Sequence, residues 1–111
     1  MAFLEFKNVR IAGISAGVPK NILSNLHPDI SDGFSSEYAP EDFVKTTGVK
    51  ERHVSDKLCT SDLCYEATEQ LLTDLHWDKS EIEAIVFVSQ TADYILPCTA
   101  CILQDRLGLS K

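Results

Sequence analysis

The chain has 111 residues, of which 44% are hydrophobic, 24% are charged and 8% are aromatic, and its formal net charge is −7. This composition is typical of one globular domain or part of one. Its longest apolar run, Ala84–Val88, is too short to cross a bilayer, which argues against a membrane protein. The acidic balance and the lack of a Lys/Arg stripe argue against a nucleic-acid surface. The first residues carry no export signal, so we expect a cytoplasmic protein.

The first half of the chain predicts one strand and one short helix. Apolar and small residues alternate over Val9–Ile14, which predicts a strand. Residues 21–38 are rich in Asn, Ser, Asp, Gly and Pro and predict a loop. Pro40–Thr46 predicts a short helix, because Pro stands at its first position and acids occupy its first turn. Gly48 is expected to end this helix.

The second half predicts helix, strand and helix. An amphipathic helix is expected from Thr60 to about His76, because apolar residues recur every three to four positions after good capping residues. Ala84–Ser89 is continuously apolar and β-branched, which is typical of a strand covered on both faces in a parallel sheet. Pro97–Leu107 predicts a second helix with Gly108 at its C-terminal end.

A single helical turn is expected between the first long helix and the second strand, where Ser80 and Glu83 have the spacing of a capping box. The order helix, buried strand, helix predicts an α/β fold. The last predicted helix should lead into another strand. We therefore expect residues 1–111 to be an incomplete segment of a larger domain.

Four cysteines lie at positions 59, 64, 98 and 101, and the last two form a C-x-x-C motif. Four thiolates can hold zinc, and a C-x-x-C can be a redox pair. We favour a third interpretation, in which the cysteines are reduced and buried as small hydrophobic residues, because Cys98 and Cys101 enter an apolar helical stretch. No metal site and no cofactor are predicted.

The three histidines are scattered: His27 stands in a polar loop, His53 ends the stretch Lys50–His53, and His76 is at a predicted helix end, so none is favoured as a catalytic residue. Phosphate-binding glycine motifs, a G-x-S-x-G elbow and an H-E-x-x-H motif are absent from the sequence. No catalytic residue is assigned within the chain. Composition and spacing alone lead no further than an incomplete cytosolic α/β domain.

Four stretches carry more specific information when they are taken in order. They are Thr47–His53, the helix from Ser61 that contains Glu66-Ala67, Ile82–Thr91, and Leu96–Gly108. In this order and with these gaps, the chain from about Val9 to Lys111 resembles the N-terminal part of β-ketoacyl-acyl-carrier-protein synthase III.

The resemblance implies a partial thiolase-like fold, namely the N-terminal segment of the first α/β half, with a mixed sheet covered by helices. Members of the family condense an acyl-CoA starter with malonyl-carrier protein in fatty acid biosynthesis, through a thioester on a Cys. The family's catalytic Cys, His and Asn would all fall beyond Lys111. We therefore expect this acyltransferase chemistry to be absent from the 111-residue chain by itself.

The resemblance also implies substrate-binding positions. Many members hold the CoA adenine between an aromatic residue in the short helix and an Arg beside the T-G motif. Without gaps these positions are Asp42 and Thr46, which depart from the pattern, and a slip of one residue would place Phe43 at the aromatic position. Arg52 is expected either to contact phosphate or to pair with a neighbouring acid, Glu51 or Asp56. Leu96 would lie in a loop that reaches the partner subunit's acyl pocket.

Two alternatives stay open. The departures at Asp42 and Thr46 suit another thiolase-fold condensing enzyme, such as a hydroxymethylglutaryl-CoA synthase-like or specialised-metabolite synthase. A small non-catalytic metal-binding module built on the C-x-x-C is the other. The expected partners of the whole enzyme are acyl-CoA and acyl carrier protein. We also expect a homodimer, or self-association of the chain through its unpaired apolar strand.

Overall fold

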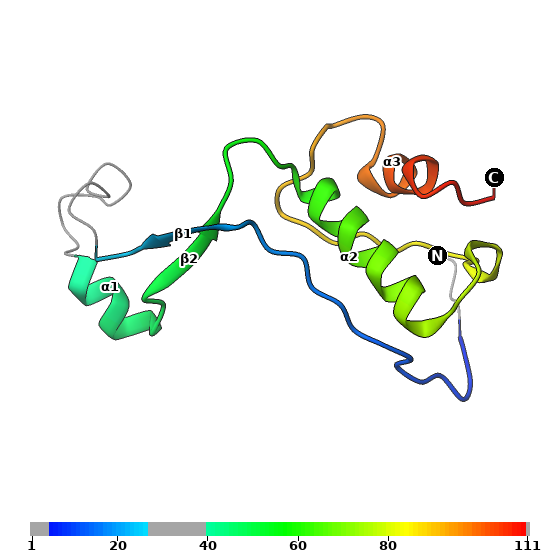
Figure 1. The fold of residues 1–111 in the computed structure, drawn as a ribbon, viewed down its shortest axis with the longest axis horizontal. Helices are drawn as coiled ribbons and strands as arrows, with labels where there is room; N and C mark the ends of the chain where they lie inside the picture. The colour runs from blue at the N-terminus through cyan, green and yellow to red at the C-terminus, as the bar shows by residue number, and fades with distance from the viewer. Residues whose placement is uncertain (1–4, 27–39, 111) are drawn as a thin grey trace. The chain divides into compact units, whose positions relative to one another are not determined.

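The computed structural model describes residues 5–26 and 40–110, which divide into two compact units. Unit 1 contains the described parts of residues 1–17 and 59–111, and unit 2 contains those of residues 18–58. The elements in chain order are β1 (Asn21–Ser24), α1 (Pro40–Thr47), β2 (Glu51–Val54), α2 (Thr60–Leu75), the 3-10 helix η2 (Lys79–Glu81) and α3 (Thr99–Arg106) (Figure 1). Among the described helices, none has the length and hydrophobicity needed to span a membrane.

In unit 2, two short strands pair with each other. β1 and β2 are antiparallel, with Leu23 opposite Arg52. Asn25 lies just beyond β1 and is only 1% exposed; its side-chain Nδ2 donates to the Val49 carbonyl at 2.9 Å, and its backbone N–H donates to the Lys50 carbonyl at 2.8 Å. These bonds hold the chain after β1 against the chain before β2.

The loop predicted over residues 21–38 is wrong at its start, because residues 21–24 form β1; the rest of that loop lies outside the described residues, apart from residues 25 and 26. β2 was not predicted either. Each strand has only four residues, and neither sequence alternates apolar and polar residues in the way by which strands are recognised. Their pairing depends on a partner about 30 residues away in the chain.

The short helix predicted in unit 2 is confirmed as α1. Thr47 closes its last turn, because its Oγ1 donates to the Phe43 carbonyl at 2.8 Å. Gly48 follows with a φ of +76°, a left-handed conformation that costs a residue with a Cβ about 1–2 kcal/mol. The predicted stop at Gly48 therefore has a conformational cause.

In unit 1, α2 and α3 pack around a small apolar core, and both predicted helices are confirmed. The buried residues Leu103, Leu107 and Leu109 form the core. Cys64 and Tyr65 from α2 pack against them, as do residues of the extended segment that follows η2. Gly108, with a φ of +67°, turns the chain after α3 so that Leu109 folds back onto this core.

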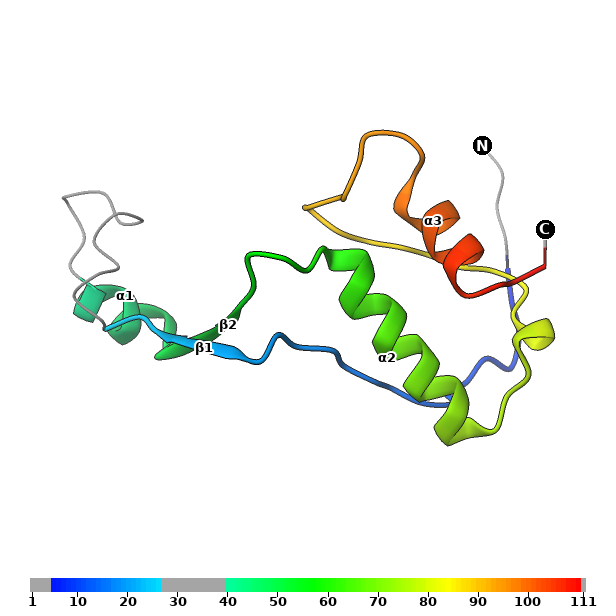
Figure 2. The same cartoon turned by 45° about the horizontal axis from the view of Figure 1, so that its top comes forward.

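The two strands predicted in unit 1 are wrong as hydrogen-bonded strands. Residues 9–14 and 84–89 are extended, but neither belongs to a ladder among the described residues (Figures 1 and 2). Ile85 and Phe87 point to the core, whereas Val86 and Val88 are 86% and 89% exposed. The segment 84–89 is therefore covered on one face, not on both. A strand needs a neighbour for its backbone N–H and C=O groups, and the described chain supplies none here.

The first extended segment lies against α2 through its small residues. A Cβ on Gly17 would sit 2.7 Å from the Leu63 carbonyl oxygen, and a Cβ on Gly13 would sit 2.8 Å from a Leu71 methyl group. Backbone and helix therefore approach closely only because both positions are glycine. Ile11 and Ile14 of this segment are exposed.

The capping box predicted at Ser80 and Glu83 is wrong by two residues. The N-cap of η2 is Asp78, whose Oδ1 accepts the Ser80 N–H at 2.8 Å and the Ser80 hydroxyl at 2.6 Å. Glu81 completes the box, because its Oε2 accepts the Asp78 N–H at 2.9 Å. A carboxylate two residues earlier is the stronger acceptor for the free N–H groups of the turn.

Candidate functional site

The predicted substrate-binding residues Asp42, Phe43, Thr46 and Arg52 all belong to unit 2. Asp42 and Thr46 are one helical turn apart on α1, so they lie on the same face of the helix, and both are exposed. Phe43 is half-buried. Arg52 stands on β2 with its side chain exposed. Unit 2 thus carries an exposed polar helix face and an exposed guanidinium.

Arg52 does not make the ion pair that was the simpler expectation for it. Among the described residues, the ion pairs are Lys79 with Glu69 and Arg106 with Asp62, so the predicted pairing of Arg52 with Glu51 or Asp56 is wrong. On an antiparallel strand, neighbouring residues point to opposite faces, which separates Arg52 from Glu51. Within residues 5–26 and 40–110 the Arg52 guanidinium therefore has no ion-pair partner, and its five N–H donors suit a phosphate or carboxylate.

Leu96, the fifth predicted site residue, belongs to unit 1, in the loop before α3. It is 81% exposed, and the preceding Ile95 is 97% exposed. Apolar side chains this exposed lose the free energy that burial would provide, about 25 cal/mol per Å² of apolar surface. The loop therefore presents an apolar tip without a cover among the described residues.

A polar cluster at the start of α2 was not predicted from the sequence. Arg106 of α3 donates to Asp62 Oδ1 at 2.8 Å and to Ser61 Oγ at 3.1 Å, and its guanidinium lies 4.8 Å from the centre of the Tyr65 ring. Asp62 Oδ2 also accepts the Cys59 N–H at 2.8 Å. This backbone bond first, and the Arg106 guanidinium second, lower the pKa of the Asp62 carboxyl.

The same cluster ties the end of the second extended segment to α2. Asp93 Oδ1 accepts the Ser61 N–H at 3.3 Å, and Thr60 Oγ1 donates to the Thr91 carbonyl at 3.3 Å. Residues 91–93 come three to five residues after the apolar run Ala84–Val88, so the cluster fixes the direction of the chain there. The charged members are the Arg106 guanidinium and the carboxylates of Asp62 and Asp93, and no nucleophile in the cluster has a base beside it, so we interpret the cluster as a positioning device.

The described histidines have structural partners. The Nδ1 atom of His53 lies 2.6 Å from the Pro19 carbonyl oxygen. His76 caps α2 in a left-handed conformation, with its backbone N–H directed at the carbonyls of Leu72 and Thr73. His27 lies outside the described residues. Within residues 5–26 and 40–110, no three His, Cys, Asp or Glu side chains gather as metal ligands.

The prediction that the cysteines are buried is wrong for three of the four. Cys59, Cys98 and Cys101 are exposed, and Cys64 is half-buried. α3 turns Thr99 and Leu103 toward the interior, which leaves Cys98 and Cys101 on its outer side. All four cysteines are free thiols, and Cys98 Sγ and Cys101 Sγ lie 3.3 Å apart.

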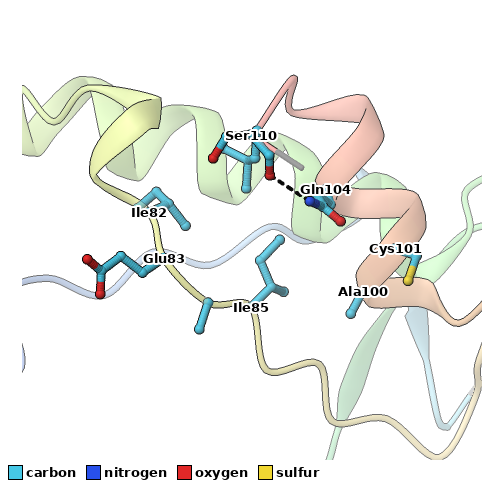
Figure 3. Close-up of a pocket in the computed structure, with 9 residues that line it drawn as sticks. Ile82, Glu83, Ile85, Ala100, Cys101, Gln104 and Ser110 are labelled. Atoms are coloured by element: carbon cyan, nitrogen blue, oxygen red, sulfur yellow. Dashed lines mark hydrogen bonds between the residues drawn. The ribbon is translucent and has the colours of Figure 1, made fainter.

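A groove of about 270 Å³ lies between the extended segment after η2 and α3 (Figure 3). Ile82, Glu83 and Ile85 line one side, and Cys101 and Gln104 line the other. Gln104 Nε2 donates to the Ser110 carbonyl at 2.7 Å and so closes one end of it. The groove runs along unpaired backbone, so a further extended segment is the kind of structure that fits it.

Comparison with known proteins identifies the relatives of this chain. It is 39% identical over 106 residues to a β-ketoacyl-[acyl-carrier-protein] synthase III of Rhodopirellula baltica. The matched region covers 94% of this chain and 29% of the relative. The enzyme of the same name from Staphylococcus epidermidis is 38% identical over 105 residues, covering 94% and 32%. The chain is homologous to part of β-ketoacyl-[acyl-carrier-protein] synthase III. It spans about 30% of the length of these synthase III relatives, and no protein-family model matches it.

Solved structures agree with the synthase III relationship. A 3-oxoacyl-(acyl-carrier protein) synthase from Burkholderia xenovorans LB400 superposes with a TM-score of 0.72 at 38% identity, covering 86% of this chain and 27% of that one. OleA from Xanthomonas campestris gives a TM-score of 0.74 at 25% identity, covering 96% and 32%. The fold is therefore part of the thiolase-like α/β fold that was expected. The unpaired segments 9–14 and 84–89 belong to a partial copy of it.

Proposed function

We propose that this chain is the N-terminal segment of a condensing enzyme, a 3-oxoacyl-[acyl-carrier-protein] synthase III. The whole enzyme would join an acyl-CoA starter to malonyl-carrier protein in fatty acid biosynthesis. The observation that carries the proposal is the synthase III similarity over more than nine-tenths of the chain. The described residues contain no nucleophile paired with a base, so the role assigned to the segment is substrate binding and not bond chemistry.

Within this function, unit 2 would form one side of the CoA entrance. The exposed guanidinium of Arg52 has no ion-pair partner among the described residues and suits a phosphate group, which Arg binds with two parallel hydrogen bonds. Phe43 offers the aromatic ring of α1, while Asp42 and Thr46 occupy the exposed face of that helix. Neither Asp42 nor Thr46 has a ring or a guanidinium on which adenine could stack, so adenine stacking on this face would be weak.

The test uses the protein encoded by the complete reading frame, assayed with acyl-CoA and malonyl-carrier protein. Arg52→Ala is expected to raise the KM for acyl-CoA about tenfold, which corresponds to ~1.4 kcal/mol for one lost charge-assisted hydrogen bond, with little change in kcat. Arg52→Lys should recover part of this loss. Thr46→Arg should lower the KM, because it restores the cation that the family carries beside the T-G motif.

The matched control is Glu51→Ala, because Glu51 is the exposed neighbour of Arg52 on β2 and points to the opposite face. Its KM should stay within twofold of the wild-type value. If the enzyme is active and its KM for acyl-CoA changes in neither Arg52→Ala nor Thr46→Arg, the assignment of the CoA entrance to unit 2 is contradicted. A complete protein that condenses no acyl-CoA with malonyl-carrier protein would contradict the function itself.

A second thiolase-fold condensing enzyme is the alternative that the observations favour next. OleA covers 96% of this chain, against 86% for the synthase from Burkholderia, although its sequence identity is lower. The acidic and neutral residues at positions 42 and 46 point the same way. Condensation of the acyl-CoA when malonyl-carrier protein is left out of the same assay would favour this alternative.

The loop at Leu96 would act at a subunit interface. Ile95 and Leu96 are almost fully exposed here, and a second subunit could bury both. In the proposed cytoplasmic homodimer, Leu96 would reach the acyl pocket of the partner subunit. An apolar tip of this kind would contact the acyl chain and not the charged CoA.

A further inference from the structure

The first turn of α3 carries two thiols in contact. Cys98 is the N-cap of α3, and Cys101 is its third residue. Cys98 Sγ and Cys101 Sγ lie 3.3 Å apart, within hydrogen-bond distance, and both side chains are exposed. A disulfide has an S–S distance of about 2.05 Å, so the two sulfurs need to approach by only about 1 Å.

We propose that Cys98 and Cys101 form a reversible redox pair, in which Cys98 is the attacking thiol and Cys101 the resolving thiol. The C-x-x-C spacing, the contact between the sulfurs and the exposure of both carry the inference. Redox-active cysteines share this arrangement, with the attacking sulfur at a helix N-terminus. The proposal does not depend on the function assigned above.

The surroundings of the two sulfurs distinguish their roles. The backbone N–H of Cys101, followed by the Cys101 thiol, lowers the pKa of the Cys98 thiol. The Cys98 side chain forms no capping hydrogen bond of good geometry, so we attribute the effect of the N–H to charge–dipole attraction. The Cys98 sulfur in turn raises the pKa of the Cys101 thiol. Cys98 is therefore the more readily deprotonated of the two thiols, and Cys101 is the one that keeps its proton to higher pH.

The oxidant is a small disulfide such as glutathione disulfide. The Cys98 thiolate attacks one sulfur of that disulfide, the S–S bond breaks, and the first glutathione leaves as a thiolate that takes a proton from water. Cys101 then loses its proton to water and attacks Cys98 Sγ, which releases the second glutathione. The protein dithiol is oxidised by two electrons, and one glutathione disulfide is reduced to two thiols.

The other two cysteines do not form such a pair. Cys59 is exposed at the N-cap of α2 but has no thiol partner among the described residues, and Cys64 is half-buried against the core. A metal site is the competing use of two thiols, but no third ligand stands near them within residues 5–26 and 40–110. Cys59 therefore serves as a matched exposed cysteine that lacks a resolving partner.

The test equilibrates the 111-residue chain with glutathione buffers of graded oxidised fraction, alkylates the remaining thiols, and maps the products by peptide mass spectrometry. The wild-type chain is expected to lose two alkylatable thiols as a Cys98–Cys101 disulfide, without a stable glutathione adduct at either. Cys101→Ser should instead accumulate glutathione on Cys98. Cys59→Ser should behave as the wild type at positions 98 and 101.

Three outcomes would overturn the proposal. The first is a stable glutathione adduct on Cys98 in the wild-type chain. The second is a Cys98–Cys101 disulfide that needs as large an oxidised fraction of glutathione as the formation of a glutathione adduct on Cys59. The third is a disulfide that joins two different chains. The mapping of the wild-type chain decides among these without any variant, so a misfolded variant would not obscure the result. Circular dichroism before and after oxidation checks that the helices persist.

Discussion

The two units contrast in how their extended segments satisfy the backbone. In unit 2, β1 and β2 pair with each other, and Asn25 closes the end of the ladder with its side chain and its own N–H. In unit 1, residues 9–14 and 84–89 have strand-like backbones but no ladder among the described residues. Unit 1 instead depends on helices that pack on an apolar core. The comparison teaches that apolar β-branched sequence alone does not make a strand, because the hydrogen bonds come from a neighbour.

The largest expected effect concerns association through the unpaired segment of unit 1. Val86 and Val88 are 86% and 89% exposed beside unpaired backbone, which is a template for another chain. We expect the 111-residue chain to self-associate at micromolar concentration despite its charge of −7, because apolar burial at ~25 cal/mol per Å² outweighs repulsion screened over roughly 8 to 10 Å. Sedimentation should show species well above 12.3 kDa.

The double variant Val86→Glu with Val88→Glu should shift the chain to a single species at 12.3 kDa. Val49→Glu is the matched control, since Val49 is an exposed valine of unit 2 at 42%. It should leave the association unchanged. A wild-type chain that stays monomeric when the salt concentration rises would show that the unpaired segment does not drive association.

A smaller effect is expected on the free energy of unfolding, which depends on apolar packing in unit 1 and on a hydrogen bond in unit 2. Leu103 is 4% exposed in the core of unit 1, so Leu103→Ala should lower the free energy of unfolding by about 2–5 kcal/mol. Asn25→Ala leaves the Val49 carbonyl of unit 2 without its donor, which should cost about 1–3 kcal/mol. Hydrogen exchange followed amide by amide should place each loss in its own unit.

The control for this pair is Leu58→Ala, because Leu58 is 50% exposed and should change stability by less than ~0.5 kcal/mol. Loss of protection in unit 1 after Asn25→Ala, or in unit 2 after Leu103→Ala, would mean that the two units unfold together. The two units would then differ in how their extended segments are hydrogen-bonded, but they would not be independently stable.

The smallest effect is a pH dependence within unit 1. The pKa of Asp62 lies below its ordinary 3.8, because the Cys59 N–H and then Arg106 favour the carboxylate. A lowered folded-state pKa contributes stability that is present above the unfolded value and is lost as the pH falls through the folded value. Asp62→Asn should therefore flatten the acid limb of the stability curve.

NMR titration of the Asp62 carboxyl gives the direct measurement. Arg106→Gln should raise this pKa only in part, because the Cys59 N–H, the larger cause, remains. Asp78 is the internal reference, since its pKa is lowered mainly by the Ser80 hydroxyl and should not respond to Arg106. A pKa of Asp62 that returned fully to its ordinary value in Arg106→Gln would contradict the role given to the backbone bond.

Local patterns predicted the helices well. The periodicity after Thr60, the proline at position 40 and the glycines at 48 and 108 each act within a few residues, and the structure has α2, α1 and the turns where these signals stand. The motifs around Thr47-Gly48 and Leu96-Pro97 predicted the relationship to synthase III, because their order and spacing are specific even where each is short.

The candidate site was less predictable, for a physical reason. Arg106 and Asp62 are 44 residues apart, and no pattern in the sequence marks them as an ion pair. The thiols of Cys98 and Cys101 follow an apolar stretch that suggests burial, yet the rotation of α3 about its axis exposes both. The substrate-binding roles of Asp42, Phe43, Thr46, Arg52 and Leu96 stay predictions.

The sequence by itself therefore determined where α1, α2 and α3 lie, to within two residues at each end, and which family the chain resembles. Helices close their hydrogen bonds within four residues, so the local sequence holds the information for them. Tertiary structure alone decided that residues 21–24 pair with residues 51–54, that residues 84–89 have no strand partner within residues 5–26 and 40–110, and that two thiols meet at the start of α3. Each of these depends on the presence or orientation of a distant neighbour, which no short stretch of sequence specifies.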